Sequence, residues 1–141
     1  MIQTYIHPHL KKPNRKYLRI LAQKVWDSYK KNKCIVSINF VDSKTMIDIH
    51  EQYLQDKSNT DVITFNLGIG PDGKEIADIY ICTEVAETNA AMFNCSYEDE
   101  VARLVVHSML HFVGYTDETH EKRQQMHQLE NHFLKQFPLN S

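Results

Sequence analysis

The chain has 141 residues, of which 42% are hydrophobic and 24% charged, and its formal net charge at pH 7 is −2. This composition is typical of one globular domain, expected here to span residues 1–141, and it excludes an extended disordered chain. No run of about 18 apolar residues occurs, and the first residues lack the apolar core of a signal peptide, so we expect a cytoplasmic protein without a membrane segment.

The first 33 residues carry most of the positive charge. They hold nine lysines and arginines against one acid, Asp27, which gives a formal charge of +8 and leaves −10 for the rest of the chain. A basic end of this kind suits contact with phosphate groups, but a solvated helix face gives the same pattern. The charge alone therefore leaves both interpretations open.

Hydrophobic periodicity predicts a succession of helices and strands. The expected helices cover residues 16–30, 43–54, 83–93, 96–113 and 118–137, and the expected strands cover residues 34–41, 60–67 and 76–82. Residues 68–75 hold three of the four glycines, which makes the last two strands a hairpin candidate. This order predicts an α+β fold, in which a small mixed sheet of about four strands is packed by four to six helices.

The expected helix over residues 96–113 is strongly apolar. Ser96 suits its N-cap position and Gly114 the position just after its end. Such a helix is expected to be central and buried on most sides. From position 101 to position 113 only four residues are polar: Arg103, His107, Ser108 and His111.

Two of these polar residues, His107 and His111, lie four positions apart and therefore share one helix face. Two neutral imidazoles so placed suit a borderline metal ion such as zinc. A third ligand ten positions after the first requires the chain to leave the helix and fold back, and Gly114 permits that break for Asp117. We therefore expect one divalent ion, by preference zinc, at the end of the central helix. His120 is the alternative third ligand, and Asp117 could instead cap the last helix.

The spacing resembles the H-E-x-x-H-x-x-G-x-x-H pattern of metzincin peptidases, with two changes. Asp117 stands in place of the last histidine, and Ser108 stands where a peptidase has its glutamate general base. Serine cannot take a proton from a zinc-bound water at neutral pH. Proteolysis is therefore disfavoured, although another metallohydrolase activity, such as a peptidase, remains an alternative.

A closer resemblance covers three stretches in one order, from Tyr53 to Asp117: "YLQDKSNTDVITF", "ADIYIC" and "VVHSMLHFVGYTD". They are similar to the signatures of the YbeY family, bacterial metal-dependent endoribonucleases of ribosomal RNA maturation. The last stretch aligns in register with that family's H-G-x-L-H-L-x-G-Y-D-H, with Ser108 in place of the glycine and Asp117 at the place of the final histidine. The matching residues are Tyr53, Thr60, Asp61, Val62, Phe65, Asp78, Ile79, Ile81, His107, Leu110, His111, Gly114 and Tyr115.

The resemblance implies an α+β fold and a zinc-like ion held by His107, His111 and Asp117. It also implies cleavage of single-stranded RNA, maturation of the 16S rRNA 3′ end and ribosome quality control. The expected partners are the 16S rRNA precursor and the small ribosomal subunit, with no organic cofactor and no membrane. The catalytic base stays unassigned. A non-catalytic ribosome-assembly factor with a structural metal is the alternative.

The sequence departs from the family pattern just after Tyr53. An arginine of the family is replaced by Leu54, and the following positions hold Gln55, Asp56, Lys57 and Asn59. Arg103 shares the helix face of His107 and His111, so we consider it a substitute that binds phosphate or anchors the site. Alternatively, it forms an ion pair with an acid of the first helical turn. Tyr53 and Tyr115 are candidates for stacking on bases or for packing in the core.

Overall fold

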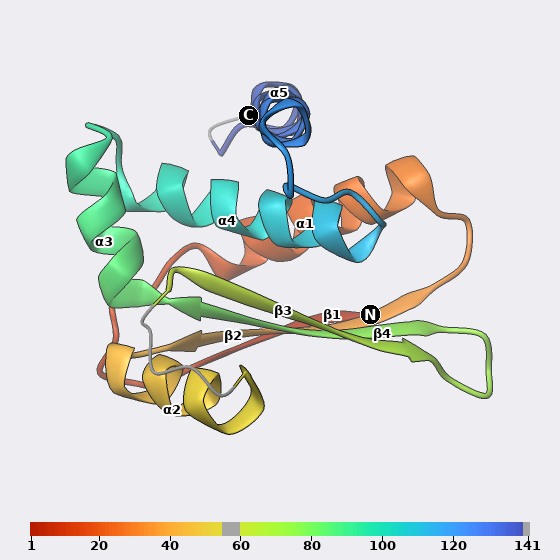
Figure 1. Ribbon diagram of the computed structural model, residues 1–141, viewed down its shortest axis with the longest axis horizontal. Coiled ribbons are helices and arrows are strands. Elements are labelled where there is room, and N and C mark those ends of the chain that lie inside the picture. Colours follow the sequence, from red (N-terminus) through yellow and green to blue (C-terminus); the bar gives the residue numbers. More distant parts are fainter. Residues whose placement is uncertain (55–59, 140–141) are drawn as a thin grey trace.

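The computed structural model describes residues 1–54 and 60–139 (Figure 1). Its elements follow the chain as β1 (Ile2–Ile6), α1 (Arg15–Tyr29), β2 (Cys34–Val41), α2 (Ser43–Leu54), β3 (Val62–Ile69), β4 (Glu75–Cys82), α3 (Thr83–Met92), α4 (Tyr97–Phe112) and α5 (His120–Gln136). The departures from the family pattern at Gln55, Asp56, Lys57 and Asn59 lie outside the described residues.

The strands form one mixed sheet in the order β1-β2-β4-β3. β1 and β4 both run parallel to β2, whereas β3 runs antiparallel to β4, as the expected hairpin requires. A β-bulge interrupts the register of β3 between Asn66 and Gly68. Four strands and five helices confirm the expected α+β fold.

The sequence pattern did not predict β1. The strand has only five residues, and its partners in β2 are distant in sequence, since Ile2 lies opposite Val36. Parallel pairing of this kind needs a crossover connection, which α1 supplies. β1 is therefore identified only by its pairing with β2 in the folded chain, whereas the other strands can be recognised from the local hydrophobic pattern.

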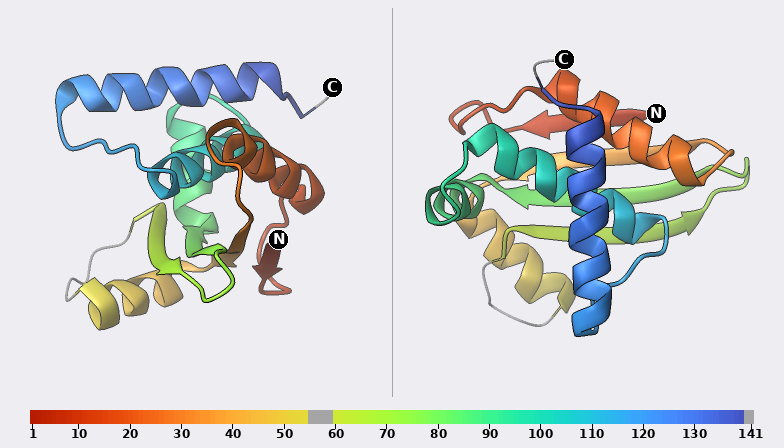
Figure 2. Two further views of the ribbon diagram at one scale, coloured as in Figure 1. Left: turned by 90° about the vertical axis from the view of Figure 1, so that its right-hand side faces the viewer. Right: turned by 90° about the horizontal axis from the view of Figure 1, so that it is seen from above.

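The elements form four layers (Figures 1 and 2). α1 and α4 cover one face of the sheet, α2 lies on the other face, and α5 crosses over α4 on the side away from the sheet. Trp26 of α1 stacks on Phe112 of α4, with ring centroids 4.9 Å apart. The expectation that α4 is central and buried is confirmed. Its N-cap is Ser96, whose hydroxyl accepts a hydrogen bond from the backbone N–H of Asp99.

α4 owes this position to its composition. Val101, Val105 and Leu110 are among its fully buried residues and pack into the main core with strands β2 and β4. A helix apolar on most sides is stable only when neighbours cover it on most sides. Within residues 1–54 and 60–139, none of the helices has the length and apolar character that a membrane span requires.

Candidate metal centre

The C-terminal end of α4 is a tight glycine turn. The backbone N–H of Gly114 donates to the carbonyl of His111, and that of Tyr115 donates to the carbonyl of Leu110 (3.0 and 2.9 Å). These two bonds form a Schellman motif, which needs a residue of positive φ. Gly114 provides it, with φ of +116°. The turn ends the helix and directs the chain back along it, as the sequence predicts.

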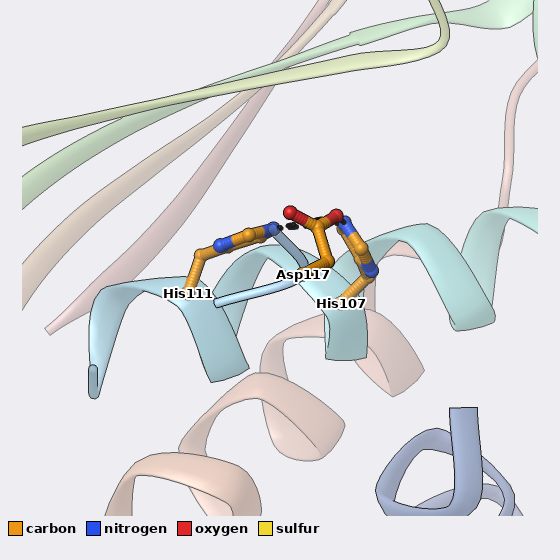
Figure 3. A group of neighbouring side chains, drawn as sticks. All are labelled: His107, His111 and Asp117. Carbon is orange, nitrogen blue, oxygen red and sulfur yellow. Dashed lines mark hydrogen bonds and ion pairs between the residues drawn. The ribbon is translucent and has the colours of Figure 1, made fainter. Parts of the chain in front are cut away.

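This turn brings the side chain of Asp117 to the two histidines of α4 (Figure 3). The Nε2 atoms of His107 and His111 are 3.0 Å apart. The Oδ2 atom of Asp117 lies 3.6 Å from Nε2 of His107 and 3.4 Å from Nε2 of His111. Among the described residues these three offer donor atoms within 4.8 Å of one another.

The three donors fit a zinc ion in both type and spacing. A tetrahedral zinc with bonds of about 2.0–2.1 Å holds its ligand atoms about 3.3 Å apart. The distances between the donor atoms here range from 3.0 to 3.6 Å. Two imidazoles and one carboxylate are a ligand set of catalytic zinc sites, which keep a fourth position for water or substrate.

Two alternatives from the sequence are not supported by the geometry. His120 begins α5 as an exposed residue and is not among the three clustered donors. Asp117 does not cap α5, because the hydroxyl of Thr119 accepts the hydrogen bond from the N–H of Lys122 (3.1 Å). The structure thus brings together the residues that the H-x-x-x-H and glycine pattern indicated.

Ser108 is fully buried, and its hydroxyl has no hydrogen-bond partner among the described residues. The residue that replaces the peptidase glutamate therefore lies in the core rather than in the cleft beside the histidines. No general base is available at this position.

The sequence did not single out Glu130, which contacts the first ligand. Its Oε2 atom lies 2.7 Å from Nδ1 of His107, although Glu130 itself is only 5% exposed. A signal was present: Met126, Glu130 and Phe133 are the buried residues of α5, at positions i, i+4 and i+7. An acid on the apolar face of an amphipathic helix indicates a charged partner in the layer below.

His107 and Glu130 each shift the pKa of the other. Burial lowers the pKa of His107, but the hydrogen bond and charge of Glu130, with the charge of Asp117, raise it above its ordinary value overall. Burial raises the pKa of Glu130, but the hydrogen bonds from His107 and Arg103 hold it below its ordinary value. Glu130 is therefore a carboxylate at neutral pH.

Arg103 lies on the same face of α4 but turns toward α5. Its Nη1 donates to Oε1 of Glu130 (2.9 Å), and its Nη2 donates to Oδ1 of Asn131 (2.6 Å). The alternative, an ion pair with an acid of the first turn of α4, is not what the structure shows, because Arg103 pairs with Glu130 of α5 instead. This position fits an anchoring role, and the guanidinium also lines a pocket next to His107.

A polar cleft of about 510 Å³ opens beside the three donors. β3 and the residues just before it form the opposite wall. Asp61 is the one carboxylate other than Asp117 among the described residues that line it, and Nδ2 of Asn89 donates to its Oδ2 (3.2 Å). The lining residues are Thr60, Asp61, Val62, Thr64, Asn66, His107, His111, Phe112 and Asp117.

The two tyrosines considered for base stacking differ in exposure. Tyr115 is half-buried, and its ring meets the ring of Tyr29 edge to face at 5.3 Å, which agrees with the packing alternative. Tyr53 is 62% exposed at the end of α2, with its ring 5.6 Å from that of Phe65.

Comparison with known proteins shows to which family this chain is similar. The family model described as "Endoribonuclease YbeY" matches residues 4–138. A Flavobacterium psychrophilum protein of that name is 34% identical over 108 residues, covering 75% of this chain and 76% of its own. A Parabacteroides distasonis protein of that name is 32% identical over 114 residues, covering 81% and 79%.

A Chlorobium luteolum protein of the same name is 41% identical over 88 residues, which is 62% of this chain. The matched region spans 63% of the length of that relative. The match with a relative from Chlorobaculum tepidum spans 66% of that relative's length, so in both cases the match covers just under two thirds of the relative. The fold is similar to that of a Thermotoga maritima protein solved in solution, with a TM-score of 0.63 and 24% identity over 99% of this chain and 93% of the other.

Proposed function

Since this chain belongs to the endoribonuclease YbeY family, we propose that it is a metal-dependent endoribonuclease that hydrolyses single-stranded ribosomal RNA. One observation carries the proposal. Two imidazoles and one carboxylate, a donor set of catalytic zinc sites, converge beside an open polar cleft. The whole stretch of residues 1–141 acts as one domain in this proposal.

His107, His111 and Asp117 would hold the ion. When bound, it would supply Lewis acidity toward a phosphoryl oxygen and lower the pKa of a water molecule. The remaining chemistry belongs to the opposite wall of the cleft. The hydroxyls of Thr60 and Thr64 are donors suited to phosphate oxygens.

Asp61 is our candidate for the proton acceptor. It is the carboxylate of the cleft that does not belong to the metal ligands, and the hydrogen bond from Asn89 to Oδ2 fixes its orientation. A general base must reach the attacking oxygen directly or through one water. The position of Asp61 across the cleft from the three donors supports such a role.

The proposed substrate is the 16S rRNA precursor, with the cut made during maturation of its 3′ end or during quality control of the small ribosomal subunit. The support is the resemblance of three stretches of this chain to the family signatures. Action on these partners would take place in the cytoplasm, which is the location we propose. Exposed lysines before and within α1, such as Lys12 and Lys16, supply positive charge for the phosphate backbone.

The deciding experiment incubates the full chain with single-stranded RNA and with 16S precursor, with zinc and with a chelator. We expect zinc-dependent cleavage that a chelator abolishes and that His107→Ala lowers at least about 100-fold. His120→Ala is the matched control, since it removes an exposed histidine near the site. It should cleave like the unaltered protein.

Each other outcome has a definite meaning. Cleavage that survives both the chelator and His107→Ala contradicts the proposal. Binding to pre-ribosomal particles without any cleavage favours the assembly-factor alternative.

Asp61→Asn should lower the cleavage rate by about 100-fold or more without loss of zinc, as expected for removal of a general base. Asp48→Asn, at an exposed position on α2 on the other face of the sheet, controls for the loss of a charge.

A further inference from the structure

Glu130 of α5 is the most buried charged side chain at the metal centre that is not itself a ligand, among the described residues. Figure 2 shows α5 crossing over α4, which carries both histidine ligands. A carboxylate at 5% exposure is costly unless its oxygens have partners. The partners of Glu130 therefore show what this position is built for.

Each oxygen of Glu130 has one partner on α4. Oε1 accepts from Nη1 of Arg103 at 2.9 Å, and Oε2 accepts from Nδ1 of His107 at 2.7 Å. Arg103 is itself fixed by a second bond to Oδ1 of Asn131 at 2.6 Å. The carboxylate is thus held from one side by the guanidinium and presents its free oxygen to the imidazole.

The contact determines which nitrogen of His107 carries the hydrogen. An ionised carboxylate can only accept, so Nδ1 of His107 must be the protonated ring nitrogen. In the neutral ring Nε2 then keeps its lone pair, and it is Nε2 that lies 3.0 Å from Nε2 of His111 and 3.6 Å from Oδ2 of Asp117. The tautomer imposed by Glu130 is the one that a metal ion at this site needs.

We propose that Glu130 is a positioning residue that fixes the tautomer and ring orientation of His107 for metal binding, with Arg103 holding Glu130 in place. Docking of α5 and loading of the metal are then one coupled equilibrium. The coupling is reciprocal: a bound ion strengthens the docking of α5, and loosening α5 lowers the affinity for the ion by the same factor. This inference rests on the metal site of the proposed function.

The test measures zinc affinity of the full chain by competition with a chromophoric chelator, in the absence of RNA. Glu130→Gln keeps the volume but offers Arg103 and His107 only one acceptor oxygen. With that oxygen taken by Arg103, the amide NH₂ would meet Nδ1 and favour the opposite tautomer. We expect Glu130→Gln to lower zinc affinity about 10- to 100-fold. Glu130→Asp keeps the charge and should retain more of the affinity.

This order of effects separates positioning from simple packing. A residue that only fills space tolerates the isosteric glutamine better than the shorter aspartate. The proposal would therefore be overturned if Glu130→Gln bound zinc more tightly than Glu130→Asp. Glu121→Gln, an exposed acid in the first turn of α5, is the matched control and should bind zinc normally. Nitrogen chemical shifts of the imidazoles in the metal-free protein, followed to a pH at which the rings are neutral, give a second readout: Nδ1–H of His107 in the unaltered chain, Nε2–H in Glu130→Gln.

Hydrogen exchange tests the coupling to α5. Zinc should increase the protection of α5 amides in the unaltered protein and have little effect on them in Glu130→Gln. If zinc increased the protection of α5 amides equally in both proteins, the coupling would be overturned.

These measurements of zinc affinity, imidazole shifts and amide exchange are independent of RNA cleavage. If zinc affinity depends on Glu130 but the chain cuts no RNA, the proposed function alone is refuted. If the chain cuts RNA and Glu130→Gln binds zinc with normal affinity, this inference alone is refuted.

Discussion

Ser108 follows the first metal ligand directly, yet its environment is entirely different. His107 lies at the cleft with its side chain 23% exposed, whereas Ser108 is fully buried with an unpartnered hydroxyl among the described residues. Adjacent residues on a helix point about 100° apart, so one step along α4 leads from the cleft into the core. The identity of this residue therefore affects stability and not the chemistry of the cleft.

Replacing this hydroxyl gives a direct stability test. We expect Ser108→Ala to stabilise the protein by about 1 kcal/mol, because it removes a buried group without a hydrogen bond and improves helix propensity. Chemical denaturation of the zinc-free chain measures the free energy of unfolding. Zinc affinity should stay unchanged. A loss of stability would show that the hydroxyl has a hydrogen-bond partner in solution.

The limits of prediction from sequence are clear at the residue scale. His107, His111 and Asp117 fall within eleven positions, so helix geometry and one glycine are enough to bring them together. Glu130 is 23 positions from His107 and meets it only because α5 crosses α4. The partner of Arg103 was missed for the same reason, since helix packing decides that contact.

At the scale of elements, the end of α4 determines the third ligand. A side chain added at Gly114 would meet nothing within 4 Å, so space does not require glycine there. The backbone does, because φ is +116°, a conformation that residues with a side chain adopt only with strain. The connection from α4 to Asp117 thus depends on one backbone angle.

Gly114→Ala should therefore weaken metal binding through the backbone. We expect a loss of about 1–3 kcal/mol in stability and at least a tenfold loss of zinc affinity, because relief of the strain displaces Asp117. Gly73→Ala in the β3–β4 turn is the matched control, with φ of +82° and equally open surroundings. It should lose stability but not zinc affinity. Equal zinc affinity in the two variants would contradict the expectation.

The elements themselves were predictable where the pattern is local. All five helices and the β3–β4 hairpin follow from periodicity and from glycines in the turn. β1 was not predictable, because this strand of five residues gains its partners only after α1 has returned the chain to the sheet. The order β1-β2-β4-β3 is likewise a property of packing rather than of any one segment.

At the scale of the whole molecule, the charge is divided between segments. Of the nine cations in residues 1–33, Lys11 pairs with Glu87 at 3.8 Å and Lys30 with Glu75 at 3.5 Å. Lys12 and Lys16 are exposed next to or within α1, which lies on the same side of the sheet as α4 (Figure 1). This face of the sheet therefore carries the metal centre beside β3 and a source of positive charge beside β1, at the opposite edge (Figure 2).

Reversing these charges should weaken RNA binding in a salt-dependent manner. We expect Lys12→Glu with Lys16→Glu to lower affinity for single-stranded RNA and to reduce the slope of log affinity against log salt by about 0.7 per lost contact. Lys44→Glu with Lys74→Glu changes the charge equally on α2 and the β3–β4 turn. Fluorescence anisotropy over a salt series compares them. If the two double variants show the same slope of log affinity against log salt, α1 does not contact the phosphate backbone.

The bulge in β3 has a consequence for how molecules meet one another. β3 is an edge strand, and it exposes two large apolar side chains, Leu67 at 56% and Ile69 at 70%. A regular edge with such side chains is a template on which a strand of another molecule can pair and start aggregation. Here the ladder is broken between Asn66 and Gly68, and the Gly68 N–H is already bonded to the side-chain oxygen of Asn66 (3.0 Å). The irregular strand that borders the cleft thereby also resists edge-to-edge association at high concentration.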